Sequence, residues 1–231
     1  MQPKGNPWKR QRELKKQDIP TPQSIIQTCL GFNSLMKRCL FALLYLTGGR
    51  CSEVVKCKYL RKNIYKQERR TDKYGVEKMY IKRNIHETPL IEKVEKVELN
   101  YPGITKGDIT FGTTKDKEIM TISMQNRKNK DYKRKNIPIT VSKESKMISV
   151  IREYLATLPS TDTPLFPICV RKAEYILAET PYNPHFLRDI RLTHMVMIYD
   201  FNAFQLVKFA GWKDIKPAEK YIRLGIKDII Y

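Results

Sequence analysis

The chain has 231 residues, of which 41% are hydrophobic, so it can bury one sizeable core. Lys and Arg number 44 against 24 Asp and Glu, which gives a formal net charge of +20 and indicates a polyanionic partner. The longest apolar run, residues 39 to 46, is too short to cross a bilayer, and the N-terminus has no apolar signal core. Nucleic acid is therefore favoured over a membrane.

The cysteine pattern indicates a reducing compartment and no metal site. The five cysteines contain no C-x-x-C pair and lie mostly in apolar helical patterns, where cysteines serve as small buried hydrophobes. The three histidines do not gather with them at ligand spacing, so we expect no metal and no other cofactor. The residues concerned are Cys29, Cys39, Cys51, Cys57, Cys169, His86, His185 and His194.

The first quarter of the chain contains a basic segment followed by helical patterns. Residues 1 to 20 are basic and nearly without apolar side chains, which is typical of a basic arm or linker, or equally of a tail without a role. Apolar residues at helical spacing predict a buried helix over 34 to 47, which Gly48-Gly49 ends. A second helix is predicted to open around Arg50, with Ser52 as its N-cap.

The middle of the chain is predicted to form β-structure. Residues 61 to 107 are charged and turn-rich, and we expect an inserted excursion of weak hairpins there. Three better strands are predicted at 108 to 111, 119 to 124 and 136 to 140. The segment between the last two, residues 127 to 135, has basic side chains at six of its nine positions.

The last third of the chain is predicted to be helical. Ser142 is a candidate cap for an amphipathic helix, and the prolines that follow this helix indicate a loop. The predicted fold class is thus α+β, mostly helical with a small antiparallel sheet. The predicted helices are 143 to 158, 171 to 179, 185 to 199, 204 to 209, and one around 217 to 223.

Four segments resemble, in order, the landmarks of the tyrosine recombinases, the phage-type integrase family. In that family a buried helix ends in T-G-x-R-x-x-E, a hairpin carries a lysine, H-x-L-R follows, and a G-[HW] pair comes shortly before a tyrosine. Trp212 precedes Tyr221 by nine residues, which is the family's interval. Order and spacing together make the match specific. The segments are LLYLTGGRCSE (43 to 53), a basic hairpin ending in NIPI (136 to 139), HFLRDIRLTHM (185 to 195) and AGWKDIKPAEKY (210 to 221).

The resemblance covers residues 21 to 231 and implies that they form a tyrosine recombinase catalytic domain, after a basic arm or linker stub at 1 to 20. Conventional members carry a further N-terminal domain that clamps DNA, which these residues do not include. Two departures, the excursion at 61 to 107 and Asp189 in place of a commoner histidine, suggest a divergent member from a virus or other mobile element.

The residue types also suit cleavage of a phosphodiester, which needs a nucleophile, stabilisation of charge on the phosphate, and a proton for the leaving oxygen. Arg50 and Arg188 would clamp the phosphate with paired donors, and Glu53 would orient Arg50. By resemblance, His185 handles a proton or binds phosphate, and Tyr221 forms a covalent 3′-phosphotyrosyl bond. Each arginine could instead be a surface salt-bridge residue.

Other site residues are assigned by position. Trp212 would donate its indole N–H to a phosphate or pack the site, and His194 lies on an apolar stripe typical of a core histidine. By similarity, Lys128 is the hairpin lysine, with Lys130 as the alternative and Lys133 close by. The remaining basic residues of the hairpin suit contacts with DNA phosphates. The expected DNA-binding residues are Arg127, Lys130, Lys133, Arg134 and Lys135.

The resemblance implies a site-specific DNA recombinase or integrase that works without metal or ATP on double-stranded DNA, with no small-molecule substrate. Protomers would associate on DNA as a dimer or tetramer, in the cytoplasm at the nucleoid of a prokaryotic host, with a virus or plasmid as candidate source. A type IB topoisomerase or telomere resolvase would share this chemistry. The other alternative is a DNA-binding relative without activity. A metal-dependent nuclease is disfavoured because no paired carboxylate motif is present.

Overall fold

The computed structural model describes residues 19–71, 74–85, 88–125 and 134–225. The chain forms two compact units, of which one is Cys57–Tyr101 and the other is the chain on both sides of it. The α+β class expected from the sequence is confirmed, with small antiparallel sheets beside the helices. The basic arm at 1 to 20 lies outside the described residues except for its last two.

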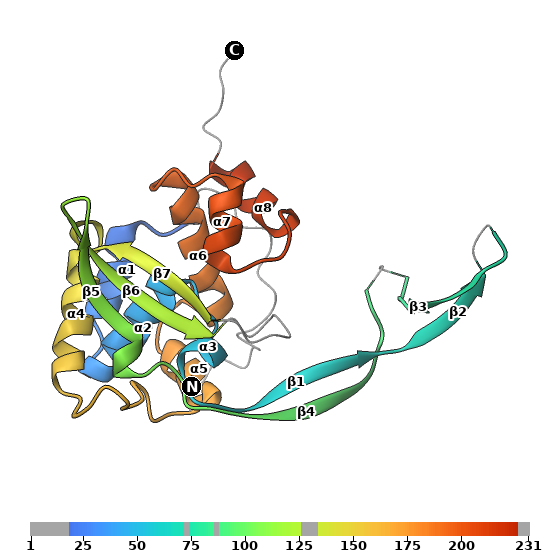
Figure 1. Cartoon of the computed structure of the whole chain (residues 1–231), viewed down its shortest axis with the longest axis horizontal. Helices are drawn as coiled ribbons and strands as arrows, with labels where there is room; N and C mark the ends of the chain where they lie inside the picture. The colour runs from blue at the N-terminus through green and yellow to red at the C-terminus, as the bar shows by residue number, and fades with distance from the viewer. Residues whose placement is uncertain (1–18, 72–73, 86–87, 126–133, 226–231) are drawn as a thin grey trace, which may run out of the picture. The chain divides into compact units, whose positions relative to one another are not determined.

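The larger unit is built around the buried helix α2 (Figure 1). Every residue of α2 from Cys39 to Thr47 is buried, as its nearly unbroken apolar sequence predicts. Helices α1, α4 and α6 all pack against it. The helices are α1 (Pro22–Leu30), α2 (Leu35–Thr47), α3 (Cys51–Val54), α4 (Ser145–Ala156), α5 (Val170–Leu177), α6 (Pro184–Met197), α7 (Ala203–Ala210) and α8 (Lys216–Gly225).

A three-stranded antiparallel sheet completes this unit, in the order β5 (Ile109–Thr114), β6 (Lys117–Gln125), β7 (Arg134–Thr140). The strands match the three predicted ones. Alternate residues of β6 and β7 are buried in the core, because side chains of a strand alternate between its two faces. These inward residues are Met120, Ile122, Met124, Ile137 and Ile139.

The smaller unit consists of antiparallel strand pairs. β1 (Cys57–Tyr65) pairs with β4 (Ile91–Tyr101), and β2 (Gln67–Thr71) pairs with β3 (Glu77–Ile81). The hairpins expected in the excursion are therefore present, but the expected bounds of 61 to 107 are wrong. Residues 102 to 107 belong to the larger unit, where Ile104 is buried and its N–H donates to the Val54 carbonyl at 3.0 Å.

Both predicted helix caps are corrected. Ser52 lies inside α3, and the cap position is Arg50, whose backbone N–H donates to Glu53 Oε2 at 3.0 Å. Ser142 lies in a short 3₁₀ helix, Val141–Lys143, and α4 begins only at Ser145. Helix α1 was not predicted, although Thr21 caps it and a proline opens it, a common pair of start signals.

Buried polar contacts fix α6 against its neighbours. His194 is 2% exposed, so its expected role as a core histidine is confirmed. Its Nε2 faces the Pro20 carbonyl at 2.9 Å and must donate, so Nδ1 accepts from the Tyr45 hydroxyl at 2.7 Å. Arg191 forms a buried ion pair with Glu144. Breaking such a pair costs about 3–5 kcal/mol, so α6 is held firmly in place.

Among the described residues, no helix is long and apolar enough to cross a membrane. Four of the five cysteines are buried thiols, as expected, whereas Cys169 is exposed.

Candidate active site

The turn after α2 is shaped by its two glycines. Gly48 has φ +53°, in the left-handed region that glycine adopts without strain, and its N–H donates to the Tyr45 carbonyl at 3.1 Å. At Gly49 a Cβ atom would come within 2.8 Å of Met124 Cε. The Thr47 hydroxyl accepts the Gly49 N–H at 3.0 Å. The T-G-G sequence therefore sets the position of the next residue, Arg50.

Arg50 and Glu53 form a single unit at this turn. Glu53 accepts both the Arg50 N–H at 3.0 Å and the Arg50 guanidinium, with 2.9 Å between Nη1 and Oε1. Glu53 is 1% exposed, and burial alone would raise its pKa. The charges of Lys135 and Arg50, the Arg50 N–H and the charge of Arg188 outweigh burial and hold the pKa of Glu53 below its ordinary value. The predicted orienting contact is present.

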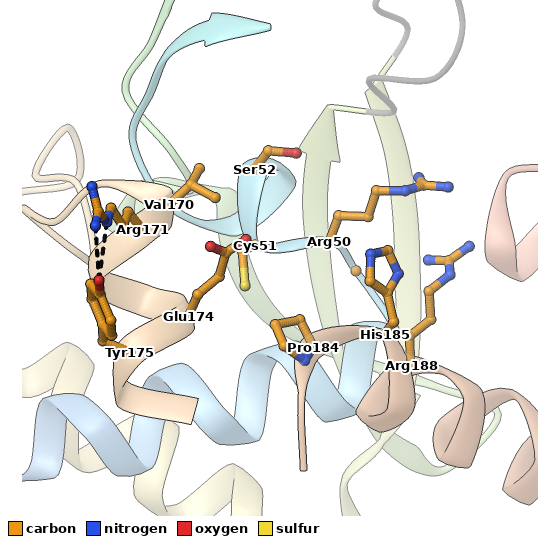
Figure 2. Close-up of a pocket in the computed structure, with 11 residues that line it drawn as sticks. Arg50, Cys51, Ser52, Val170, Arg171, Glu174, Tyr175, Pro184, His185 and Arg188 are labelled. Atoms are coloured by element: carbon orange, nitrogen blue, oxygen red, sulfur yellow. Dashed lines mark hydrogen bonds between the residues drawn. The ribbon is translucent and has the colours of Figure 1, made fainter. Parts of the chain in front are cut away.

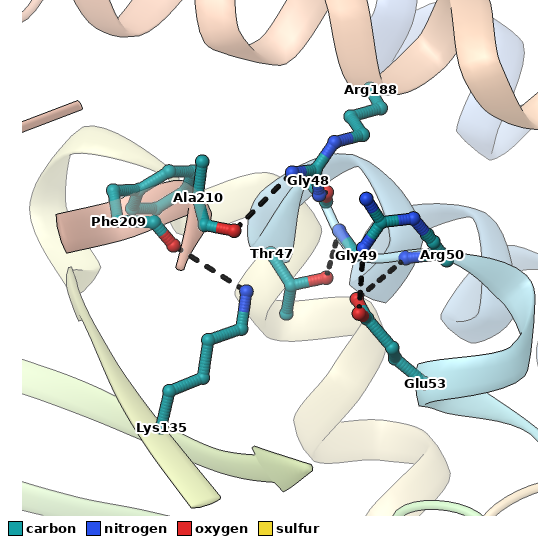
Figure 3. A network of polar contacts seen from close by, with 9 residues as sticks. All are labelled: Thr47, Gly48, Gly49, Arg50, Glu53, Lys135, Arg188, Phe209 and Ala210. Carbon is teal, nitrogen blue, oxygen red and sulfur yellow. Dashed lines mark hydrogen bonds and ion pairs between the residues drawn. The ribbon is translucent and has the colours of Figure 1, made fainter. Parts of the chain in front are cut away.

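Arg188 reaches the same place from helix α6. The N-terminus of α6 is capped by Asn183, whose side chain accepts the Phe186 N–H at 2.8 Å. One turn later, the Arg188 guanidinium donates to the Gly48 carbonyl and to the Ala210 carbonyl, the latter at 3.3 Å (Figure 3). It is 7% exposed, and burial, followed by the charge of Arg50, lowers its pKa. Its place is thus fixed by backbone groups from two other segments.

Lys135 on strand β7 completes this polar cluster. Its ammonium group lies 3.4 Å from the Phe209 carbonyl oxygen (Figure 3). Burial lowers the pKa of Lys135 to about 8. The negative charge of Glu53 raises this pKa, whereas the positive charges of Arg188 and Arg50 lower it further. From the sequence, Lys135 was expected only to bind DNA. The alternation of Lys135 with the buried Ile137 and Ile139 is a signal that places it on the inward face of the strand.

A cavity of about 570 Å³ opens beside these residues, and Figure 2 shows Arg50, His185 and Arg188 side by side along it. His185 lies in the first turn of α6, one turn before Arg188, as the H-x-x-R spacing predicts. The far wall comes from α5, where Arg171 donates to the Tyr175 hydroxyl at 3.0 and 3.2 Å. The structure therefore brings three predicted site residues together at one opening.

Tyr221 is near this cluster but faces elsewhere. It is 2% exposed and belongs to a small apolar cluster of α6, α7 and α8. Its ring stacks on Trp212 with 5.8 Å between centroids, and Trp212 in turn lies 5.9 Å from the guanidinium carbon of Arg188. The Tyr221 hydroxyl donates to Asp189 Oδ1, which also receives the Lys220 ammonium at 3.2 Å. Neither Tyr221 nor Trp212 lines the cavity.

Burial and the contact with Asp189 both favour the neutral phenol of Tyr221. Burial first, and then the Asp189 carboxylate, raises the pKa of Tyr221 well above its ordinary value, whereas Arg188 lowers it. In the sequence, Asp189 stands out only as a departure from the family pattern. The sequence places Asp189 one residue after Arg188. Its hydrogen bond with Tyr221, however, depends on how α8 packs on α6.

Of the remaining predicted residues, the structure describes only Arg134, which is not brought into this site. Arg134 is exposed and pairs with Asp108 and the Ser123 side chain. The others lie outside the described residues: Arg127, Lys128, Lys130 and Lys133. Within the part of the chain that the structure describes, no group of three or more His, Cys, Asp or Glu side chains is placed to hold a metal ion.

Comparisons of this chain with models of protein families, with curated proteins and with solved structures gave no match.

Proposed function

We propose that the chain is the catalytic domain of a tyrosine-type DNA strand transferase, a site-specific recombinase or integrase that cleaves and rejoins double-stranded DNA. The observation that carries the proposal is the cluster at the cavity. Arg50 and Arg188, from segments far apart in the sequence, line the cavity together with His185. Glu53 and Lys135 belong to the same polar cluster as the two arginines (Figure 3). In a chain with a net charge of +20, a phosphate of DNA is the substrate that such a cluster suits best.

The proposed chemistry assigns one role to each group. Arg50, Arg188 and His185 stabilise the charge that develops on the non-bridging oxygens. Tyr221 turns from its buried position toward the bound phosphate, and its oxygen attacks phosphorus and loses its proton. The bond to the 5′ oxygen breaks, and that oxygen takes a proton from a general acid. The phosphotyrosyl bond conserves the energy of the broken one, so a 5′ hydroxyl of a partner strand can reverse the reaction without ATP.

Asp189 is the proposed acceptor for the proton of Tyr221. A general base must lie within hydrogen-bond reach of the proton that it takes, and the Tyr221 hydroxyl already donates to Asp189. A neutral phenol is a poor nucleophile, and the raised pKa of Tyr221 makes this one harder still to ionise unaided. If the phenol proton passes to Asp189 while the Tyr221 oxygen attacks the phosphate, Tyr221 does not have to ionise beforehand.

Asp189→Asn should therefore slow covalent adduct formation by about 10²-fold or more, the usual contribution of a general base. The amide oxygen of Asn can still accept a hydrogen bond from the tyrosine, so the packing of α8 on α6 should survive. The measurement is the rate of adduct formation in single-turnover reactions across a range of pH. Affinity for DNA should change little. A faster reaction in the variant would mean that Asp189 restrains Tyr221 and does not act as its base.

The function itself is tested with a nicked or suicide duplex, in which the cleaved 5′ end is lost and the covalent complex accumulates. We expect a protein–DNA adduct that resists denaturation and forms in the presence of a chelator and without ATP, because Arg50, Arg188 and His185 carry the charge-stabilising roles. Adduct formation that fails on chelation and returns with magnesium would contradict the proposal and favour a nuclease.

Recombination also requires protomers that associate on DNA, as a dimer or tetramer. A type IB topoisomerase would form the same adduct as a monomer. Measuring the mass of the DNA-bound assembly separates these two enzymes. A protein that binds duplex DNA but never forms an adduct would be an inactive relative.

A further inference from the structure

The two-stranded ribbon of β2 and β3 has two chemically different faces. Directly paired residues of antiparallel strands share a face, and alternate residues of each strand lie on the same side. Glu68 pairs with Tyr80 and Arg70 pairs with Lys78. At the end of this ladder the Lys82 N–H donates to the Lys66 carbonyl at 2.8 Å, which sets these two residues opposite each other. One face, the basic face, thus carries Lys66, Glu68, Arg70, Lys78, Tyr80 and Lys82.

The opposite face carries no excess charge. Its ionic residues, Arg69 and Glu77, lie 4.0 Å apart, and beside them are Met79 and Ile81. The other members of this face are Gln67 and Thr71. Four cations against one carboxylate leave a formal charge of +3 on the basic face and zero on the opposite one. Only the face around Tyr80 is therefore electrostatically suited to a polyanion.

Both faces are open to solvent. All residues of β2 and β3 are exposed except Glu68, which is half-buried and pairs with Arg70. The side chain of Arg70 remains 65% exposed. A two-stranded ribbon without a covering layer is only marginally stable in water, so contact with a partner would stabilise it.

We infer that the basic face of the β2–β3 ribbon is a second DNA-binding surface, which lies along the phosphates of a duplex. Its width suits this partner, since the major groove of B-DNA admits a two-stranded β-ribbon. The cations would contact phosphates without reading sequence, and the exposed ring of Tyr80 would lie among them. The inference shares with the proposed function only the premise that the partner is DNA, and it does not depend on cleavage.

Replacing Lys66, Arg70, Lys78 and Lys82 together with Thr should weaken duplex binding and flatten its dependence on salt. Each phosphate contact contributes about 0.9 to the slope of log affinity against log salt concentration, so the loss of four contacts should lower the slope by about 3.6. The measurement is fluorescence anisotropy on a labelled random-sequence duplex over a series of salt concentrations. Threonine is chosen because it favours strands and so preserves the ribbon.

The chain offers a matched pair of single variants. Arg69 and Arg70 are adjacent, both are exposed, and each pairs with a glutamate of the ribbon, but they lie on opposite faces. Arg70→Thr should lower the salt slope by about 0.9, whereas Arg69→Thr should leave it unchanged. Equal effects of the two variants would mean that general charge, and not this face, determines binding, and would overturn the inference.

A gain of affinity tests the inference in a way that misfolding cannot imitate. Glu68→Gln removes the one carboxylate of the basic face and should tighten duplex binding several-fold at low salt, and Glu77→Gln on the opposite face should not. No gain from Glu68→Gln, with an unchanged slope in the fourfold variant, would overturn the inference. The inference would also be overturned if the fourfold variant kept the salt slope of DNA binding but no longer bound anionic vesicles. The basic face would then bind a membrane surface.

The outcomes also separate this inference from the proposed function. The fourfold variant should still form the covalent adduct at saturating concentration, because the residues at the cavity are untouched. A wild-type protein that binds duplex DNA through the ribbon but forms no adduct would retain this inference and lose the proposed function. If the wild-type protein forms the adduct but no ribbon variant alters the salt slope, the proposed function stands and this inference fails.

Discussion

Tyr221→Phe should abolish the covalent protein–DNA adduct while leaving the affinity for duplex DNA nearly unchanged. The substitution removes only the oxygen that would attack phosphorus. The ring can still stack on Trp212 within the apolar cluster of α6, α7 and α8, so the fold around it should persist. The adduct is measured on a suicide duplex after denaturation, and the affinity by anisotropy on the same DNA.

Tyr199→Phe is a matched control for the loss of a hydroxyl. The Tyr199 hydroxyl also donates to a carboxylate, that of the buried Glu144, at 2.5 Å. Both variants lose a hydrogen bond to a charged group, a cost of about 1.5–3 kcal/mol in stability, but only Tyr221 is proposed to react with DNA. We expect Tyr199→Phe to form the adduct normally. An adduct from Tyr221→Phe would show that another residue is the nucleophile.

The fold was predictable where local patterns determine it. The apolar run of α2, the Gly48-Gly49 stop and the alternating strands β5 to β7 are each properties of a short stretch of sequence, and the structure has them where expected. The caps were not, because the cap positions are Arg50 and Glu144, residue types that are not preferred there. Glu53 is held by Arg50, and Glu144 is buried against Arg191. Local cap preference could not reveal those partners.

The candidate site was predictable in its residue types but not in all its contacts. Arg50, His185 and Arg188 were found from motif spacing and do line one cavity. The hydrogen bond from Tyr221 to Asp189 joins residues 32 positions apart and depends on how two helices pack. The burial of Lys135 likewise depends on α7, which supplies the carbonyl of Phe209. Neither contact follows from a single stretch of sequence.

The general acid should be Lys135, and its loss should slow cleavage of ordinary DNA by about 10²–10⁴-fold. An acid works best when its pKa lies near the working pH, and burial has lowered the pKa of Lys135 to about 8. Lys135 also lies within the field of Glu53, Arg50 and Arg188, where the phosphate is proposed to bind. By similarity, Lys128 is the alternative, followed by Lys130, and both lie outside the described residues.

The rate of cleavage should depend on pH through the protonation of Lys135. The proton that Lys135 donates is present below its pKa of about 8 and is lost as pH rises through that value. Cleavage of ordinary DNA should therefore decline above pH 8. A 5′-bridging sulfur leaves readily without a proton, so a 5′-phosphorothiolate duplex should remove the decline. The measurement is the single-turnover rate on both substrates over the same pH range.

The same sulfur substrate distinguishes the three lysines. Lys135→Ala should be slow on the oxygen duplex and largely rescued by sulfur, while Lys128→Ala and Lys130→Ala should mainly weaken binding. Arg134→Ala, one residue away on the exposed face of β7, is the matched control and should need no rescue. Rescue of Lys128→Ala alone would place the acid in the hairpin and leave Lys135 as a structural partner of Glu53. Because sulfur bypasses only the proton donor, a variant that is merely misfolded stays slow on both substrates.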